Sequence, residues 1–204
     1  MPLYEAIVNS IDAIEDTGNQ NGRIDISVIR DKQVLKEKEE RVIDEIKGFE
    51  ISDDGIGFNK GNFISFDTSD SMLKENRGGK GVGRFIWLVA FDKVQVKSVY
   101  KENGKVNSIR FDFVPRGNGI ENKKITPSEA KDLKTIVNLC DFKEKYRATC
   151  PKKLQTIAVH IIEYFLEYFI QSICPQIWLH DEQEHIHLIN PYPLSRPNFA
   201  LYLV

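Results

Sequence analysis

Apolar residues recur at helical spacing at the start of the chain. They predict an amphipathic helix over about residues 3–16. The apolar positions of this helix are Leu3, Ile7, Ile11 and Ile14. The run at 16–22 is rich in Asp, Asn and Gly, which favour turns and end helices. At 24–28, Ile and Val alternate with polar residues, and this alternation predicts a half-buried strand.

Later segments continue to mix strands with helices. Strands are predicted at 49–51, 93–100, 106–114 and 135–141, with a turn at 102–104, and a last hairpin is predicted to join 177–180 to 185–189. Helices are predicted at about 84–91 and 151–173. One face of the second helix would carry Leu154, Ile157, Ile161, Phe165, Tyr168 and Phe169.

Two stretches follow neither pattern. The densely charged residues 31–47 are expected to form a solvated hairpin or a short helix. Residues 58–77 are expected to be irregular, and a loop of this length in a compact domain is usually functional, often a lid.

This order of elements lacks the strand–helix alternation of a parallel sheet. We therefore predict an α+β fold, a two-layer sandwich of a mixed, mostly antiparallel sheet covered by helices on one face. Residues 1–142 would form the main domain. Residues 143–204 hold a long helix and a hairpin, and we expect an extension of that domain or the start of a following one.

Composition places the chain among ordinary globular proteins. Hydrophobic residues make up 41% and charged residues 28%, and the net charge of −2 indicates no dedicated nucleic-acid surface, although it leaves room for a local basic patch. Three cysteines without CxxC spacing favour reduced thiols in a cytoplasmic protein. No signal peptide is expected, and no membrane span, because the most apolar stretch carries histidine and glutamate.

The first candidate site segment lies on the first helix. Glu5, Asn9 and Asp12 stand at i, i+4 and i+7, which places them on one helical face. Any amphipathic helix can align polar residues in this way, so the pattern alone is also explained by a solvated face. As chemistry, the Asn9 amide suits Mg²⁺, and Glu5 one turn away could activate a water that attacks a phosphate.

The second and third segments are rich in glycine. Asp53-Asp54-Gly55-Ile56-Gly57 follows a strand; the simple explanation is a turn, and the functional one is a carboxylate that accepts a hydrogen bond from an adenine amino group. The run at 78–83 leads directly into an apolar helix, where free backbone N–H groups can bind phosphate. The P-loop pattern is absent, and the position of the run disfavours a Rossmann fingerprint.

Taken together, these segments resemble the GHKL ATPases, the family of gyrase B subunits, ninety-kilodalton heat-shock chaperones, sensor histidine kinases and MutL. The resemblance covers about residues 3–142 and is greatest to the chaperone-like branch. Lys134 and Arg84 depart from that branch, which usually has glycine and an apolar residue there. The matching positions are Glu5, Asn9, Asp12 and Ala13 for the first motif, Asp53, Gly55 and Gly57 for the second, Gly78, Gly81 and Gly83 for the third, and Thr135 for the threonine behind the aspartate.

The resemblance implies a Bergerat-type ATP-binding fold and a role for each site residue. Asp53 would bind the adenine amino group with the support of Thr135 and a water, Asn9 would hold Mg²⁺, and Glu5 would be the general base. The amides of 79–83 would wrap the phosphates, and Lys80 would neutralise phosphate charge. The full nucleotide-contacting set that the resemblance implies would be Asn9, Asp12, Ala13, Asp53, Gly55, Gly57, Gly78, Gly79, Lys80, Gly81, Val82, Gly83 and Thr135.

The function implied is that of an ATP-dependent conformational module of a larger protein. It would bind Mg-ATP, hydrolyse it slowly to ADP and phosphate, and meet a second copy of itself or another protein when its lid closes. The family's split ATPases use a basic residue from a following domain, which is not assigned here. The alternative is a module that binds ATP, or a partner, without turnover.

Three histidines near the end of the chain raise the question of a metal. His185 and His187 would share one face of a strand, with His180 across the hairpin. No cysteine or acidic residue is placed to complete a tetrahedron, so solvated hairpin histidines are the favoured interpretation.

Overall fold

The structure is a computed structural model, and it describes residues 2–19, 21–31, 44–67, 83–116, 119–170 and 174–188. The helices are α1 (Pro2–Glu15), α2 (Lys60–Asp67), α4 (Gly83–Ala90), α5 (Glu144–Arg147), α6 (Leu154–Tyr164) and α7 (Leu166–Ile170). The strands are β1 (Arg23–Arg30), β2 (Ile46–Asp53), β3 (Phe91–Glu102), β4 (Lys105–Phe113), β5 (Ile120–Pro127), β6 (Lys134–Phe142), β7 (Gln176–His180) and β8 (His185–Leu188).

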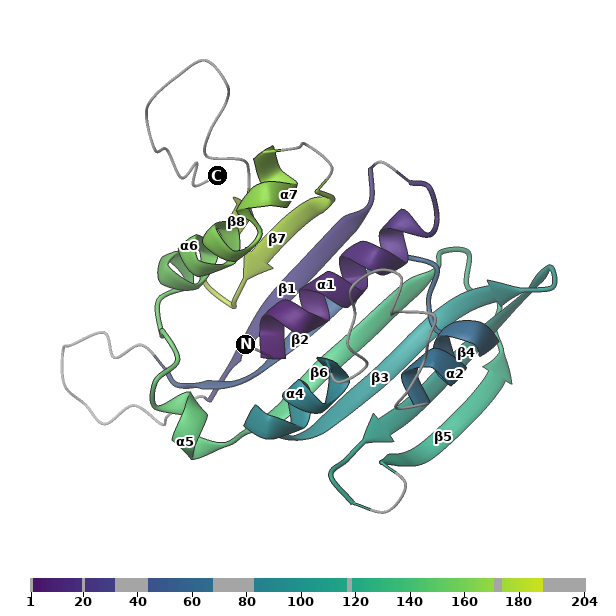
Figure 1. The fold of residues 1–204 in the computed structure, drawn as a ribbon, viewed down its shortest axis with the longest axis horizontal. Coiled ribbons are helices and arrows are strands. Elements are labelled where there is room, and N and C mark those ends of the chain that lie inside the picture. Colours follow the sequence, from purple (N-terminus) through teal and green to yellow (C-terminus); the bar gives the residue numbers. More distant parts are fainter. Residues whose placement is uncertain are drawn as a thin grey trace.

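These strands form a single eight-stranded sheet in the order β5-β4-β3-β6-β2-β1-β7-β8 (Figure 1). β1 pairs with β7 in parallel, and every other neighbouring pair is antiparallel. The protein is therefore α+β with a mixed sheet, as the order of elements predicted. β7 and β8 come from the region after residue 142, and they continue the same sheet beside β1.

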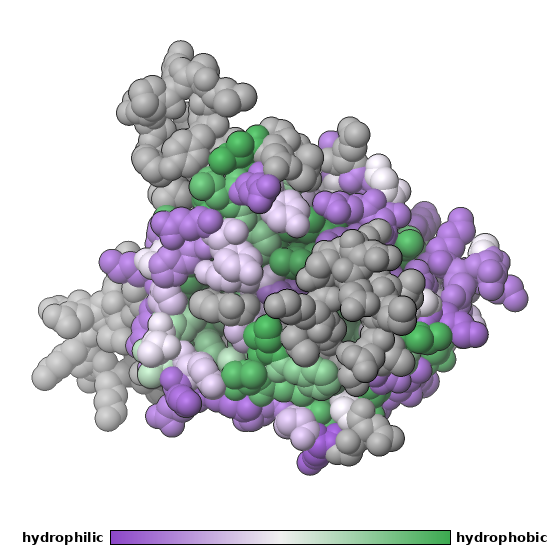
Figure 2. Space-filling view, viewed as in Figure 1, coloured by the Kyte–Doolittle hydropathy of each residue, from purple (hydrophilic) through white to green (hydrophobic). Residues whose placement is uncertain are grey.

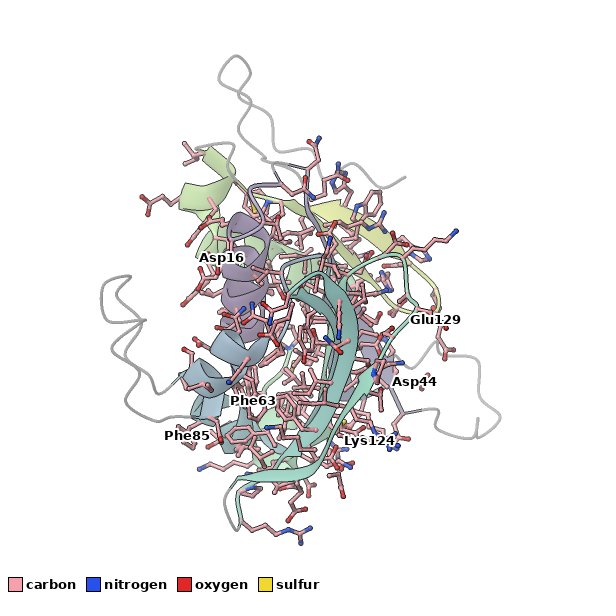
Figure 3. The ribbon with its side chains drawn as sticks, turned by 90° about the vertical axis from the view of Figure 1, so that its right-hand side faces the viewer. Asp16, Asp44, Phe63, Phe85, Lys124 and Glu129 are labelled. Carbon is pink, nitrogen blue, oxygen red and sulfur yellow. The ribbon has the colours of Figure 1, made fainter. Side chains whose placement is uncertain are left out.

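The core lies between the sheet and the helices. Strand residues alternate in burial, and the buried positions meet the apolar stripe of α1, whose Ile7 and Ile11 are fully buried. Figure 3 shows Phe63 of α2 and Phe85 of α4 on the helix side of the sheet and Lys124 of β5 on the opposite side. Figure 2, drawn from the helix side, shows apolar residues gathered over α4 and α7.

The expectation that 58–77 is irregular was wrong for residues 60–67, which form α2. The Asn59 side chain accepts a hydrogen bond from the backbone N–H of Asn62 at 2.9 Å and so caps the helix. Phe63 and Phe66, three residues apart, both pack their rings against Phe111 of β4. Residues 68–77 lie outside the described part of the chain.

Two other helices differ in extent from their predictions. The helix expected at 84–91 begins at Gly83 and ends at Ala90, because Phe91 already pairs with Phe142 as the first residue of β3. The helix expected at 151–173 is interrupted at Phe165, which leaves helical geometry with φ −101° and ψ 19° and separates α6 from α7. No helix in the described residues is both long and apolar enough to cross a membrane.

β5 is a strand that the sequence did not reveal. Its residues 121–124 are all polar, so the sequence shows no alternation of apolar and polar positions there, and residues 122–125 are all exposed in the structure. It forms because the open edge of β4 supplies hydrogen-bond partners along its length, for example at Ile109 opposite Ile125.

Residues 31–47 had been expected to form a hairpin or short helix. Of these, 46 and 47 belong to β2, and 32–43 lie outside the described residues.

Arg30 ties the later part of the chain to the sheet. Its guanidinium forms a largely buried ion pair with Asp181, at 2.9 Å, in the β7–β8 turn. It also donates to the carbonyls of Asp44 before β2 and Lys152 before α6, each at 2.9 Å. One side chain therefore holds three separate segments, which fixes β7 and β8 against the strands that carry the candidate site.

Candidate functional site

Three buried polar side chains lie side by side across the centre of the sheet. Asp53 of β2, Thr135 of β6 and Ser98 of β3 are direct neighbours in the register, and each is at most 4% exposed. The next residues in the same row are apolar, Ile24 on β1 and Ile109 on β4. Because buried polar groups require hydrogen-bond partners, a row of three polar side chains inside an apolar core is a candidate binding site.

Asp53 accepts a hydrogen bond on each carboxylate oxygen. The hydroxyl of Ser10 on α1 donates to Oδ2 at 2.9 Å, and the backbone N–H of Gly55 donates to Oδ1 at 3.0 Å. A carboxylate has about four lone-pair sites, so two accepted bonds leave capacity for a donor from a ligand. Burial raises the pKa of Asp53 to about 6; the two donors act in the opposite direction, and the charge of Asp54 adds to the rise.

The turn after Asp53 needs glycine because it passes close to other parts of the fold. A Cβ at Gly55 would lie 2.7 Å from the carbonyl carbon of Ala13, and Ile56 donates its N–H to the Ala13 oxygen at 2.9 Å. Gly57 has φ +75°, and a Cβ there would lie 2.7 Å from the Ser98 hydroxyl. Both glycines therefore hold the turn against α1 and β3 and keep the surroundings of Asp53 compact.

The polar residues of α1 lie beside this turn. With about 100° per residue, Ala13 falls between Ser10 and Asn9 on the helix surface, and Glu5 and Asp12 follow on the far side of Asn9. Glu5, Asn9 and Asp12 are all half-buried, whereas Ser10 is buried. The helix thus presents an amide and two carboxylates next to the point where Ser10 contacts Asp53.

The third segment is described only in part. Residues 78–82, which include Gly78, Gly79, Lys80, Gly81 and Val82, lie outside the described residues. Gly83 is the first residue of α4, and α4 packs against α1. The fold therefore brings together Asp53, Thr135, Gly55, Gly57 and α1, and it places the start of α4 next to the helix that carries Glu5 and Asn9 (Figure 1).

Two residues of this site were not predicted from the sequence, Ser10 and Ser98. Ser10 lies on the buried side of α1, and Ser98 occupies an inward position of β3 between the buried Val96 and Tyr100. The Ser98 hydroxyl bonds to the Thr135 hydroxyl at 2.9 Å and accepts from the backbone N–H of Phe58 at 3.0 Å. A polar residue at a core-facing position was the pattern that could have identified both.

The histidines of the last hairpin have partners within the protein. His180 Nε2 lies 2.7 Å from the Ser27 hydroxyl, and the ring of His187 stacks on Trp178. Burial lowers the pKa of His180 and of His187. Across the described ranges, no group of three or more His, Cys, Asp or Glu side chains is arranged to hold a metal ion.

No protein-family model and no curated protein matches this chain. The resemblance to the GHKL ATPases consequently rests on the three sequence motifs and Thr135 alone.

The raised pKa of Asp53 predicts a pH-dependent stability. The folded protein binds the Asp53 proton more tightly than the unfolded chain, in which the pKa is 3.8. Protonation of Asp53 therefore stabilises the fold most below pH 4, and this stabilisation is lost as the pH rises through 6. Relative to Asp53→Asn, the wild type should gain about 1 kcal/mol of unfolding free energy between pH 7 and pH 5. Urea unfolding at both pH values measures this change. The prediction is contradicted if the difference in unfolding free energy between the wild type and Asp53→Asn is the same at both pH values. It is also contradicted if the wild type gains the same amount relative to the exposed variant Asp132→Asn.

Proposed function

We propose that this chain binds Mg-ATP as a conformational module and hydrolyses it slowly to ADP and phosphate. The observation that carries the proposal is the environment of Asp53. A carboxylate buried in an apolar core, with both oxygens oriented by donors from α1 and from the following turn, is a strong and precisely directed acceptor. An adenine amino group is a donor that this arrangement suits.

The neighbouring hydroxyls support an adenine site. Thr135 stands next to Asp53 in the register and is held by Ser98 at 2.9 Å. A hydroxyl can donate and accept, so Thr135 is suited to bind a water or a ring nitrogen beside the amino group. The proposed Bergerat-type two-layer arrangement accords with this placement, because α1 packs on β1 and β2 and α4 packs on β3, on the sheet face that carries Asp53 and Ser98 (Figure 1).

The donor set on α1 fits a magnesium ion and a hydrolytic water. Asn9 supplies an amide oxygen, a ligand of the hard oxygen type that Mg²⁺ prefers, and Asp12 belongs to the nucleotide-contacting set beside it. When bound, the ion would neutralise phosphate charge. Glu5, one turn before Asn9 and half-buried, is proposed to take the proton of the attacking water. The amides of 79–83 and Lys80 complete the proposal as phosphate contacts.

Thermal unfolding with and without nucleotide tests this proposal. A ligand that binds only the folded state stabilises it by about 2.7 kcal/mol at 100 times its Kd. For a domain of this size that amounts to roughly 5–10 °C in Tm. We expect Mg-ATP to raise the Tm by this amount and Mg-GTP at the same concentration to raise it much less. No shift with Mg-ATP, or equal shifts with both nucleotides, would contradict adenine binding at Asp53.

A further inference from the structure

A row of cations crosses the sheet face that is turned away from the helices. The register places Lys97 of β3 opposite Arg110 of β4, and Arg110 opposite Lys124 of β5. All three residues are exposed. Figure 3 shows Lys124 on the side of the sheet opposite the helices. Residues directly opposite one another on antiparallel strands lie about 5 Å apart, so the three positive charges form a continuous line.

Asp112 and Glu121 lie on the neighbouring row of the same face and keep their negative charge, but neither forms an ion pair with the three cations. Asp112, two residues from Arg110 on the same strand, accepts from the amides of Gln95 at 3.2 Å and Asn122 at 2.8 Å. Glu121 forms its ion pair with Arg116 at 3.1 Å. Among the residues that the structure describes, none forms an ion pair with Lys97, Arg110 or Lys124. Facing like charges destabilise a sheet, so the row works against the fold rather than for it.

Protection of a sheet edge explains only one member of the row. Lysine on an edge strand prevents pairing with other chains, which accounts for Lys124 on β5. Lys97 and Arg110 lie on the interior strands β3 and β4, where this protection is not needed. An anion bound across the three strands would relieve the repulsion, and this accounts for all three positions.

The same row ends in stacked aromatic rings. From Lys97 the register continues through Ile136, Ser52 and Asp25 to Trp178 of β7, and then to His187 of β8. The rings of Trp178 and His187 are parallel within 4°, with centroids 4.2 Å apart. Arg23 of β1 lies over the Trp178 ring at 5.2 Å and pairs with Asp25, so Trp178 is held between Arg23 and His187, and His187 on the edge strand β8 is the ring of the stack that a base can reach. One line of the sheet thus carries cations at one end and stacked planar groups at the other.

We propose that this face binds single-stranded nucleic acid, with the cation row on the phosphates and the Trp178–His187 stack beside the bases. Surfaces for single strands combine these two features, a positively charged track and aromatic rings on which bases stack. Lys97 and Trp178 are four strands apart, roughly 19 Å at about 4.8 Å per strand, a span that a short oligonucleotide covers. An acidic peptide would match the cations but would leave the aromatic end without a planar partner.

Fluorescence anisotropy of a labelled 20-residue thymidine oligonucleotide tests the proposal. The triple variant Lys97→Gln, Arg110→Gln, Lys124→Gln should lose at least about 10-fold in affinity at 50 mM salt. The slope of log affinity against log salt should fall in magnitude by about 2, because each single-strand phosphate contact contributes about 0.7. His187→Ala should lose about 5-fold or more while keeping the wild-type slope, since it removes stacking and not charge.

The control variant removes three exposed cations that lie outside the row, Lys131→Gln, Lys145→Gln and Lys153→Gln. It should bind as the wild type does. The row variant should melt no lower than the wild type, because it removes repulsion, so loss of binding cannot be ascribed to unfolding. Absence of binding at 20 mM salt, equal loss in the control, or equally effective competition by polyglutamate would each overturn the proposal. The face is separate from the proposed ATP site, so either proposal can fail alone.

Discussion

Asp53→Asn is expected to weaken Mg-ATP binding by about 100-fold or more while the protein stays folded. An asparagine can keep the local hydrogen bonds, since its oxygen can accept from Gly55 and its Nδ2 can donate to the Ser10 hydroxyl, which rotates. It has a donor in place of the second carboxylate oxygen and no negative charge, so it is a weaker acceptor for an adenine amino group. Losing a hydrogen bond to a charged acceptor costs about 1.5–3 kcal/mol, and an unpaired buried donor adds to the loss.

Calorimetry measures this effect, with Asp54→Asn as the matched control. Asp54 is the exposed neighbour, and its substitution removes the same charge without touching the buried row. The control should bind within about 3-fold of the wild type. If the two variants lose affinity equally, net charge and not the Asp53 carboxylate determines binding.

Glu5→Gln is expected to lower the turnover rate by at least about 100-fold without weakening Mg-ATP binding. General-base catalysis typically contributes 10²–10⁴-fold, and glutamine keeps the size and polarity of the side chain but cannot accept a proton. Because the group would act in the hydrolytic step only, the Kd should change by less than about 3-fold. Phosphate release at saturating Mg-ATP gives the rate, and calorimetry gives the Kd.

Glu15→Gln provides the control, because Glu15 is an exposed carboxylate at the other end of the same helix. It should leave both quantities unchanged. A wild type that binds Mg-ATP and releases no phosphate would remove Glu5 from a catalytic role and would favour a module that binds without turnover.

Elements with a strong local pattern could be predicted from the sequence. The apolar stripe of α1, the alternation in β1 and the turn between β3 and β4 are all present as expected. α2 and β5 were missed because their stability comes from contacts distant in sequence. α2 depends on Phe111 of β4, and β5 depends on the open edge of β4. Periodicity carries no information about such partners.

The same distinction applies to the candidate site. Asp53 and Thr135 were identified one at a time, from a strand end and a threonine in the expected order. Their adjacency, and the participation of Ser98, follow from the register of β2, β6 and β3. Ser10 meets Asp53 only because α1 packs over the end of β2. The residues could be found from the sequence, but the hydrogen bonds between them depend on tertiary structure.

The cation row shows a limit of arguments from composition. The net charge of −2 gave no indication of a dedicated nucleic-acid surface and left room for a local basic patch, because it averages over the whole chain. Lys97, Arg110 and Lys124 are separated by more than ten residues each in the sequence, and the register alone brings them together. Charge that is dispersed along a chain can therefore be concentrated on one face of its sheet.

Titration of Mg-ATP and Mg-GTP into the wild type and into Asp53→Asn tests the central claim most directly. A guanine presents a carbonyl oxygen where adenine has its amino group, and that oxygen would face the Asp53 carboxylate without a proton between them. We predict that the wild type binds Mg-ATP about 100-fold or more tightly than Mg-GTP. The preference should vanish or reverse in Asp53→Asn. Equal affinity for the two nucleotides in the wild type, or an unchanged preference in the variant, would contradict the assignment of Asp53 as the adenine-binding residue.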